Sequence, residues 1–342
     1  MPPEKESQPA PVLTERAGHA ARVPLVAIVG PTASGKSALA MRLAGQLRGE
    51  ILVCDSTQVY RGFDIGTSKP SEADRRAVRH HLLDLVDPGD VFTAGDFRHH
   101  AMSALAEVRQ AGRLPILTAG TGLYLRALLE GLAAAPLRSE DLRERLRRSA
   151  ERRKPGYLHR VLARMDRAAA ARIAPRDTPK LIRAIEVCVL SGKPISEVHK
   201  AERPALEGFR AIKIGLTPPR TKLYERIERR TMEMLEHGWI EEVRGLVARG
   251  VPPNAKAFSF IGYAALRAHV HEKGELRAVI PAIQQATRRY AKRQMTWFRK
   301  EPGVRWYEGF GDDAAISQQV LSAVRRELET AGGAAAGADA AV

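Results

Sequence analysis

The fold is decided by one short stretch, Gly30-Pro31-Thr32-Ala33-Ser34-Gly35-Lys36-Ser37. It matches the pattern G-x-x-x-x-G-K-[ST], which is typical of a phosphate-binding P-loop. An apolar run that predicts a buried strand, residues 25–29, precedes it, and a run that predicts a helix, residues 38–47, follows it. This strand–loop–helix order is the context in which the pattern has structural meaning. The sequence therefore predicts a loop that binds a diphosphate, whichever molecule carries that group.

Each part of the loop has a chemical task. The glycines let the backbone turn so that successive N–H groups point at phosphate oxygens. The ammonium group of Lys36 adds a positive charge, and the hydroxyl group of Ser37 is a ligand for Mg²⁺. All eight residues, from Gly30 to Ser37, are therefore candidates for binding a diphosphate or a nucleotide.

Further apolar runs predict more buried strands. They cover residues 51–54, 114–118 and 211–216, and amphipathic helical segments alternate with them. This alternation is typical of a parallel sheet with helices on both faces. Polar residues follow the runs, at the carboxyl edge where such sheets bind ligands. The predicted fold class is α/β, with a P-loop NTPase-like parallel sheet, flanking helices and an all-helical insertion domain.

Changes in composition predict the domain boundaries. Residues 137–172 carry 12 Lys or Arg against 5 Asp or Glu and show no strand pattern, which indicates basic helices. The Pro-rich start and the Gly/Ala-rich end of the chain read as disordered tails. We expect a disordered tail (1–22), the first part of the core (23–136), a helical RNA-binding insertion (137–208), the rest of the core with basic C-terminal helices (209–310), and a terminal helix with a Gly/Ala tail (311–342).

The charge of the chain indicates a polyanionic partner. There are 55 Lys or Arg against 39 Asp or Glu, for a formal net charge of +16. Residues 287–299 hold five cations and no anion, beside an apolar flank of Ala291, Met295 and Phe298. A solvated helix face usually mixes charges of both signs, so this one favours contact with a nucleic-acid backbone.

The same composition excludes some classes of protein. No apolar stretch approaches the roughly 18 to 20 residues of a membrane span, and the N-terminus lacks a secretory signal. Cys54 and Cys188 lack the spacing of a metal site, which predicts buried reduced thiols. We expect a cytoplasmic monomer that does not bind membranes.

Asp55 ends the apolar run of residues 51–54, where two tasks are open to it. In a P-loop kinase such a carboxylate holds Mg²⁺. It could also act as a base toward a substrate bound beside the diphosphate. A kinase for a small molecule has no task for two basic helical regions.

Five motifs in order resemble the tRNA dimethylallyltransferase family, bacterial type. They are the P-loop, Asp55-Ser56-Thr57-Gln58-Val59-Tyr60-Arg61-Gly62, Asp64-Ile65-Gly66-Thr67-Ser68-Lys69-Pro70, Gly120-Thr121-Gly122-Leu123-Tyr124, and residues 287–299. The resemblance runs from about Val23 to Trp306. It implies transfer of a dimethylallyl group from dimethylallyl diphosphate to N6 of the adenine at tRNA position 37, just 3′ of the anticodon. Diphosphate is released, and Mg²⁺ is the expected cofactor.

The resemblance also implies roles for individual residues. Asp55 would be the catalytic base, Thr121 would donate to the diphosphate, and Arg230 would contact the diphosphate. Without the resemblance, Arg230 would be read as a surface partner of Glu233. The residues implied to contact tRNA are Asp55, Ser56, Thr57, Gln58, Pro179, Lys180, Leu181, Ile182, Arg183, Lys292, Arg293, Gln294, Trp297 and Arg299.

Two other functions remain open from the sequence. One is a P-loop kinase or an adenylate isopentenyltransferase that acts on a free nucleotide. The other is an RNA-binding P-loop protein without catalytic activity. Transfer to AMP rather than tRNA would distinguish the first, and any turnover would exclude the second.

Overall fold

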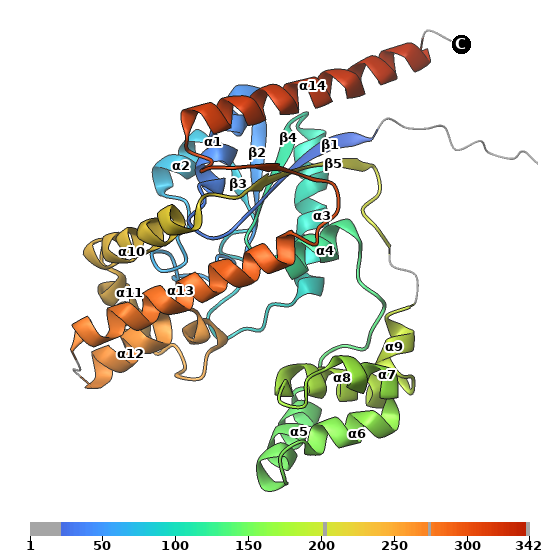
Figure 1. The fold of residues 1–342 in the computed structure, drawn as a ribbon, viewed down its shortest axis with the longest axis vertical. Helices are drawn as coiled ribbons and strands as arrows, with labels where there is room; N and C mark the ends of the chain where they lie inside the picture. The colour runs from blue at the N-terminus through green and yellow to red at the C-terminus, as the bar shows by residue number, and fades with distance from the viewer. Residues whose placement is uncertain (1–21, 201–203, 273–274, 340–342) are drawn as a thin grey trace, which may run out of the picture.

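A computed structural model describes residues 22–200, 204–272 and 275–339. Its centre is a six-stranded sheet in which every strand pair is parallel, with the order β3-β2-β4-β1-β5-β6. Helices cover both faces (Figure 1). The predicted α/β class is therefore confirmed. The strands are β1 (Val23–Val29), β2 (Gly49–Cys54), β3 (His80–His81), β4 (Leu114–Ala119), β5 (Phe209–Leu216) and β6 (Val304–Tyr307).

The strand register brings the functional loops to one edge. Val29 at the end of β1 and Cys54 at the end of β2 both pair with Ala119 at the end of β4. The next residues along each strand, Gly30 and Asp55, therefore leave the sheet at the same edge, one on each side of β4. The apolar runs form strands because both faces of a parallel sheet are buried and every position favours a β-branched or aliphatic side chain.

Two pairs of helices complete the layers. Helix α1 (Lys36–Leu47) and helix α14 (Ala314–Asp339) pack on one face of the sheet. Helix α3 (Ala94–Gln110) and helix α4 (Gly122–Leu129) pack on the other. Each pair encloses its own apolar core with the sheet, so the strands are buried from both sides.

A third cluster of helices lies beside the carboxyl edge of the sheet. It has a separate apolar core around Phe63, Trp239 and Tyr263. The lower left part of Figure 1 shows these helices next to the ends of the strands. The cluster consists of α10 (Arg220–Glu236), α11 (Trp239–Ala248), a 3₁₀ turn (Lys256–Ser259), α12 (Tyr263–Glu272) and α13 (Leu276–Phe298). A separate short helix, α2 (Glu72–Ala77), precedes β3.

Five helices between β4 and β5 form a group with its own core, away from the sheet (Figure 1). At its centre the buried Glu186 carboxylate accepts hydrogen bonds from the Arg143 and Arg183 guanidinium groups and the Ser139 N–H. Burial alone would raise the pKa of Glu186, but these bonds lower it to about 2. The helices are α5 (Glu140–Arg152), α6 (Tyr157–Met165), α7 (Arg167–Arg172), α8 (Thr178–Ser191) and α9 (Ile195–Val198).

The two chain segments that join this group to the core lie together. The Leu206 N–H donates to the Leu129 carbonyl at 3.1 Å. The Arg98 guanidinium donates to the Leu128 carbonyl at 2.7 Å and to the Pro204 carbonyl at 2.6 Å. The entering and leaving segments are thus held side by side on the core.

The structure corrects two expectations about the C-terminal part. Strand β6 lies in a region for which only helices were predicted, and it is too short for its pattern to be read from the sequence. Residues 331–339, expected to be a disordered tail, continue helix α14, because alanine favours helix and outweighs the few glycines there. Of the tail predicted for residues 1–22, residues 1–21 lie outside the described residues, as do the last three residues of the chain. In the part of the chain that the structure describes, no helix has the length and apolar character needed to cross a membrane.

Candidate active site

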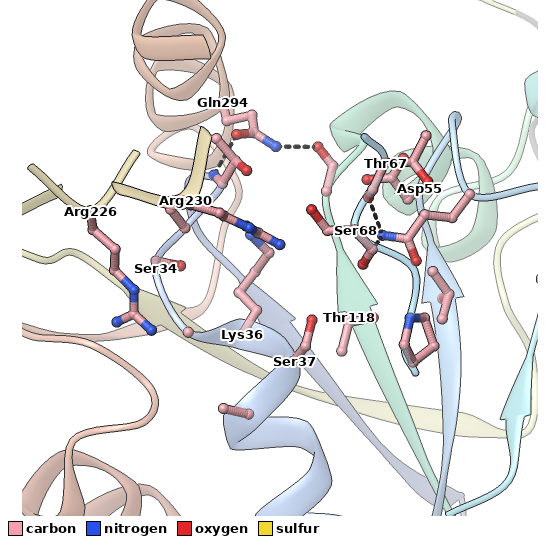
Figure 2. Close-up of a pocket in the computed structure, with 18 of the residues that line it drawn as sticks. Ser34, Lys36, Ser37, Asp55, Thr67, Ser68, Thr118, Arg226, Arg230 and Gln294 are labelled. Carbon is pink, nitrogen blue, oxygen red and sulfur yellow. Dashed lines mark hydrogen bonds between the residues drawn. The ribbon is translucent and has the colours of Figure 1, made fainter. Parts of the chain in front are cut away.

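A cavity of about 420 Å³ opens at the carboxyl edge of the sheet. The P-loop forms one wall, Asp55 and Thr118 lie across from it, and helix α10 contributes arginines. Figure 2 shows the Lys36 and Arg230 side chains converging on one side of this space and Asp55 on the other. The cavity therefore joins a cationic wall to the Asp55 carboxylate, and Glu233, the second carboxylate of its lining, pairs with Arg229.

The P-loop has the conformation that its glycines predict. Gly35 has a φ of 84°, a left-handed value that favours glycine. The Lys36 ammonium donates to the carbonyls of Gly30 at 3.0 Å and Pro31 at 2.7 Å. Burial lowers the pKa of Lys36 to about 7, the charge of Asp55 raises it, and the charge of Arg230 lowers it. A bound anion would raise the pKa of Lys36 again and so favour its charged form.

Other groups of the same wall are available to a ligand. Ser34 is one of the lining residues, and no residue in the described part of the chain bonds to its buried hydroxyl oxygen. Burial and neighbouring Arg226 lower the pKa of Arg230, as expected for a guanidinium that lacks a full counter-charge. Glu233 pairs with Arg229, so the surface pair of Arg230 with Glu233 considered from the sequence is not formed.

Asp55 is held by the residues that follow it. Its Oδ1 accepts hydrogen bonds from the Thr57 N–H at 2.8 Å and the Thr57 hydroxyl at 2.7 Å. Among the described residues, none donates a hydrogen bond to its Oδ2. A Cβ at Gly120 would lie 2.4 Å from that oxygen, so only glycine lets β4 approach the carboxylate. One oxygen is thus fixed and the other is free for a substrate.

A second cavity, of about 270 Å³, meets the first at Asp55 and Arg230. Its far wall is largely apolar and includes Trp239, which is buried. Gly66 and Gly262 enclose this indole ring, since a Cβ at either position would lie 2.1–2.2 Å from it. The arrangement offers adjacent spaces for two substrates, with Asp55 at the junction.

Two predicted site residues support this junction. The Thr121 hydroxyl accepts from the Ser56 N–H at 3.0 Å and donates to the Ser56 hydroxyl at 3.2 Å, and Thr121 does not line either cavity. This differs from the predicted contact with the diphosphate, because Thr121 precedes α4 and its side chain turns toward Ser56. The Gln58 amide donates to the carbonyls of Thr67 and Ser68, which joins two of the sequence motifs.

Gln294 connects helix α13 to the P-loop. Its Oε1 accepts from the Thr32 N–H at 2.7 Å, and its Nε2 donates to the Gly120 carbonyl at 2.8 Å. The sequence placed Gln294 among residues that contact RNA, but the side chain is buried and both of its polar atoms are engaged. The dashed lines in Figure 2 show this bridge.

We expect Gln294→Leu to raise the KM for the diphosphate substrate and to lower stability by about 1–3 kcal/mol. The change removes both bonds and leaves two backbone groups unsatisfied. Steady-state kinetics and thermal unfolding check this result. Gln285→Leu, at an exposed position of the same helix, is the matched control. Equal behaviour of the two variants would contradict a role for the bridge.

The predicted RNA-contacting residues of α8 divide into three groups. Leu181 and Ile182 are buried in the core of the insertion, so their side chains cannot reach a partner; they occupy the inward face of the helix. Lys180 pairs with Asp177 at 2.5 Å, and Arg183 is committed to Glu186. Pro179 is exposed at the start of the helix.

Helix α13 presents cations to solvent. Lys292, Arg293 and Arg299 are exposed, and Trp297 is partly so. Within the described ranges, no ion pair involves these three cations. Arg288, expected on the same face, instead pairs with Glu228 of α10 at 2.7 Å.

The oxygen donors of the cavity fit a magnesium ion held mainly by its substrate. The part of the chain that the structure describes contains no group of three His, Cys, Asp or Glu side chains able to hold a metal by themselves. Ser37 lines the cavity next to Lys36. Mg²⁺ typically keeps few protein ligands and binds phosphate oxygens and water instead.

Several residues of the cavity were not predicted from the sequence, among them Arg226, Thr118 and Tyr290. The signal for Arg226 was present, because it lies four residues before Arg230 and so shares its helix face. Tyr290, whose hydroxyl donates to the Gly120 carbonyl at 3.2 Å, could not be found without knowing that α13 meets β4.

Comparisons with known proteins identify the family of this chain. The model of the family described as IPP transferase matches residues 58–301. A tRNA dimethylallyltransferase of Koribacter versatilis (strain Ellin345) is 49% identical over 305 residues, which cover 88% of this chain and 98% of that one. One of Solibacter usitatus (strain Ellin6076) is 46% identical over 306 residues, 90% of this chain and 99% of that one.

Solved structures show the same relationship. The full-length tRNA isopentenylpyrophosphate transferase of Bacillus halodurans is 36% identical with a TM-score of 0.66, covering 91% of this chain and 98% of that one. A eukaryotic dimethylallyltransferase acting on tRNA, at 24% identity and a TM-score of 0.76, shares the fold over 90% of this chain and 80% of its own. The chain is therefore a transferase and belongs to the IPP transferase family, together with these tRNA dimethylallyltransferases.

Proposed function

We propose that this protein transfers a dimethylallyl group from dimethylallyl diphosphate to N6 of the adenine at tRNA position 37, 3′ of the anticodon, and releases diphosphate. The observation that carries the proposal is the position of Asp55. It lines the cavity of the P-loop and also the second cavity, which has room for an acceptor. A carboxylate at that junction can act on a nucleophile while the P-loop holds the leaving group.

The P-loop side stabilises the departing diphosphate. As the allylic C–O bond breaks, negative charge grows on the bridging oxygen. The loop N–H groups, Lys36 and Arg230 supply positive charge that interacts more strongly with this transition state than with the ground state. Mg²⁺, held by Ser37 and the substrate, would neutralise further charge on the diphosphate.

The acceptor side supplies a base. The N6 amine is a weak nucleophile because its lone pair is delocalised into the purine, and it becomes acidic as the N–C bond forms. The free Oδ2 of Asp55 accepts a hydrogen bond from the amine, aligns it with the allylic carbon and takes its proton. Thr57 holds the other oxygen, and Thr121 holds Ser56 beside it. The new N–C bond replaces the C–O bond, and the proton leaves through Asp55.

The RNA side requires a base turned out of its stack. An anticodon loop presents such a base at a cost of a few kcal/mol. Ser56, Thr57 and Gln58 would contact the adenine, and the exposed cations of α13 would bind the backbone. The residues of α8 predicted to contact tRNA, around Pro179 and Lys180, would contact the anticodon stem.

Ser37→Ala is expected to raise the Mg²⁺ concentration that gives half-maximal rate, because one metal ligand is lost. A magnesium titration of both proteins at saturating substrate checks this. An unchanged requirement would place the metal elsewhere.

Transfer of a labelled dimethylallyl group tests the proposal. The acceptor is an anticodon stem-loop with adenine 3′ of the anticodon, and the controls are a guanine loop and free AMP. We expect label only in the adenine loop. Transfer to AMP would favour an adenylate isopentenyltransferase, and phosphoryl transfer from ATP without prenylation would favour a kinase.

The proposal includes a monomer that works in the cytoplasm, where its tRNA acceptor is found. Size-exclusion chromatography with light scattering, on the protein alone and with the stem-loop, measures the mass in solution and so tests whether the protein is a monomer. A mass of two chains would contradict it. Cell fractionation tests the location.

A further inference from the structure

A segment near the C-terminus, residues 309–313, lies against the P-loop. The Gly311 N–H donates to the Ser34 carbonyl at 2.9 Å. A Cβ at Gly311 would lie 2.5 Å from the Gly35 carbonyl oxygen, and one at Gly35 would lie 2.5 Å from Asp312 Oδ1. Both contacts therefore require glycine. This segment lies beyond residue 301, where the family match ends.

The same segment holds one of the arginines of the cavity. Arg226 Nη1 donates to Asp312 Oδ1 at 2.8 Å, and Nη2 donates to Oδ2 at 2.7 Å. The Arg226 guanidinium also stacks on the Phe310 ring, 4.8 Å from its centre. Arg226 in turn lines the diphosphate cavity (Figure 2).

This pair differs from an ordinary surface ion pair. An isolated exposed pair contributes little, because two long side chains must be ordered to form it. Here the Arg226 side chain is 27% exposed and the Asp312 side chain 40%, the geometry is bidentate, and an aromatic ring packs on the guanidinium plane. The bond with Arg226 also lowers the pKa of Asp312, so the carboxylate stays ionised.

We propose that Asp312 is a positioning residue for the leaving group, which acts by holding Arg226 at the rim of the diphosphate cavity. Asp312 occupies two of the five N–H groups of the guanidinium, and the other three remain for phosphate oxygens. The inference rests on the proposed function for the identity of the diphosphate. It adds that the segment after the family match is part of the diphosphate site.

A double-mutant cycle tests the inference. We expect Asp312→Asn to raise the KM for dimethylallyl diphosphate and the Kd for inorganic diphosphate by about tenfold, and to leave the KM for the stem-loop unchanged. Arg226→Ala is expected to have a similar or larger effect. The double variant should be no worse than Arg226→Ala alone, and Asp312→Glu should recover part of the loss.

The neighbouring carboxylate provides the control. Asp313 accepts hydrogen bonds from the Ala315 and Ile316 N–H groups and so caps α14. Asp313→Asn should lower the melting temperature without changing the Kd for inorganic diphosphate. The inference is overturned if the effects of Asp312→Asn and Arg226→Ala add fully, or if Asp312→Asn binds diphosphate more tightly, which would make Asp312 a competitor for Arg226.

The binding assay separates this inference from the proposed function. Inorganic diphosphate binding needs no acceptor and no prenyl group. Wild-type protein that binds diphosphate but transfers nothing would refute the function and still allow the cycle to be measured. Wild-type protein that fails to bind diphosphate would refute both.

Discussion

Asp55→Asn is expected to lower turnover by about 10²–10⁴-fold, with near-normal binding of the stem-loop. Asparagine keeps a carbonyl oxygen that can accept the bonds from Thr57, so the loop should retain its shape. What is lost is the group that takes the proton from N6. Single-turnover transfer of labelled dimethylallyl, together with a filter-binding assay for the RNA, measures both quantities.

The control for this prediction is Asp87→Asn. Asp87 is exposed and pairs with Arg61, so its loss changes the net charge equally without touching the cavity. Its turnover should match that of the wild type. If Asp55→Asn bound RNA poorly but turned over normally once bound, Asp55 would be a recognition residue and not the base.

Lys36→Met is expected to lower kcat/KM for dimethylallyl diphosphate by about 10²–10³-fold, as the removal of one transition-state donor does in other enzymes. Methionine fills the volume of the lysine stem but carries no charge. The KM for the stem-loop should change little. Steady-state kinetics with each substrate varied in turn check this, and Lys222→Met, at an exposed position, is the control.

The low pKa of Lys36, about 7 in the free protein, makes the affinity for diphosphate depend on pH. A bound diphosphate favours the ammonium form and raises that pKa, so binding above pH 7 must take up a proton. Affinity is therefore expected to fall by up to about tenfold per pH unit above pH 7 until the pKa of the complex is reached. Calorimetry in buffers of different ionisation enthalpy counts the proton. Proton release in the wild type, or the same uptake in Lys36→Met, would contradict this assignment.

Local patterns predicted the central part of the fold. The P-loop and the strands β1, β2, β4 and β5 follow from apolar runs bounded by polar residues, because parallel strands are buried on both faces. Strand β3 has two residues and β6 has four, which is too short for such a pattern. Asp55, as a polar residue directly after a buried strand, was found for the same reason.

Other parts of the site depend on contacts between distant segments. Gln294 meets Thr32 across 262 positions of sequence. The helical spacing places Gln294 on the same side of α13 as the buried Ala291 and Phe298, but it does not reveal which distant groups this side contacts. The burial of Leu181 and Ile182 depends on which side of α8 faces the insertion core. The strand pattern predicts that Thr121 lies at the carboxyl edge of the sheet, as Asp55 does, but the direction of its hydroxyl group depends on Ser56.

The hydrogen-bonded segments at Leu129 and Leu206 imply that the helical insertion could be removed while the core keeps its fold. Because a hydrogen bond joins Leu129 and Leu206, the chain leaves the core and returns to it at nearly the same place. A short linker in place of residues 132–203 would have little distance to span and would keep the contact of Arg98 with Pro204. Such a shortened chain should still bind diphosphate and should lose affinity for RNA. Binding of the prenyl donor and binding of the RNA acceptor could then be engineered separately.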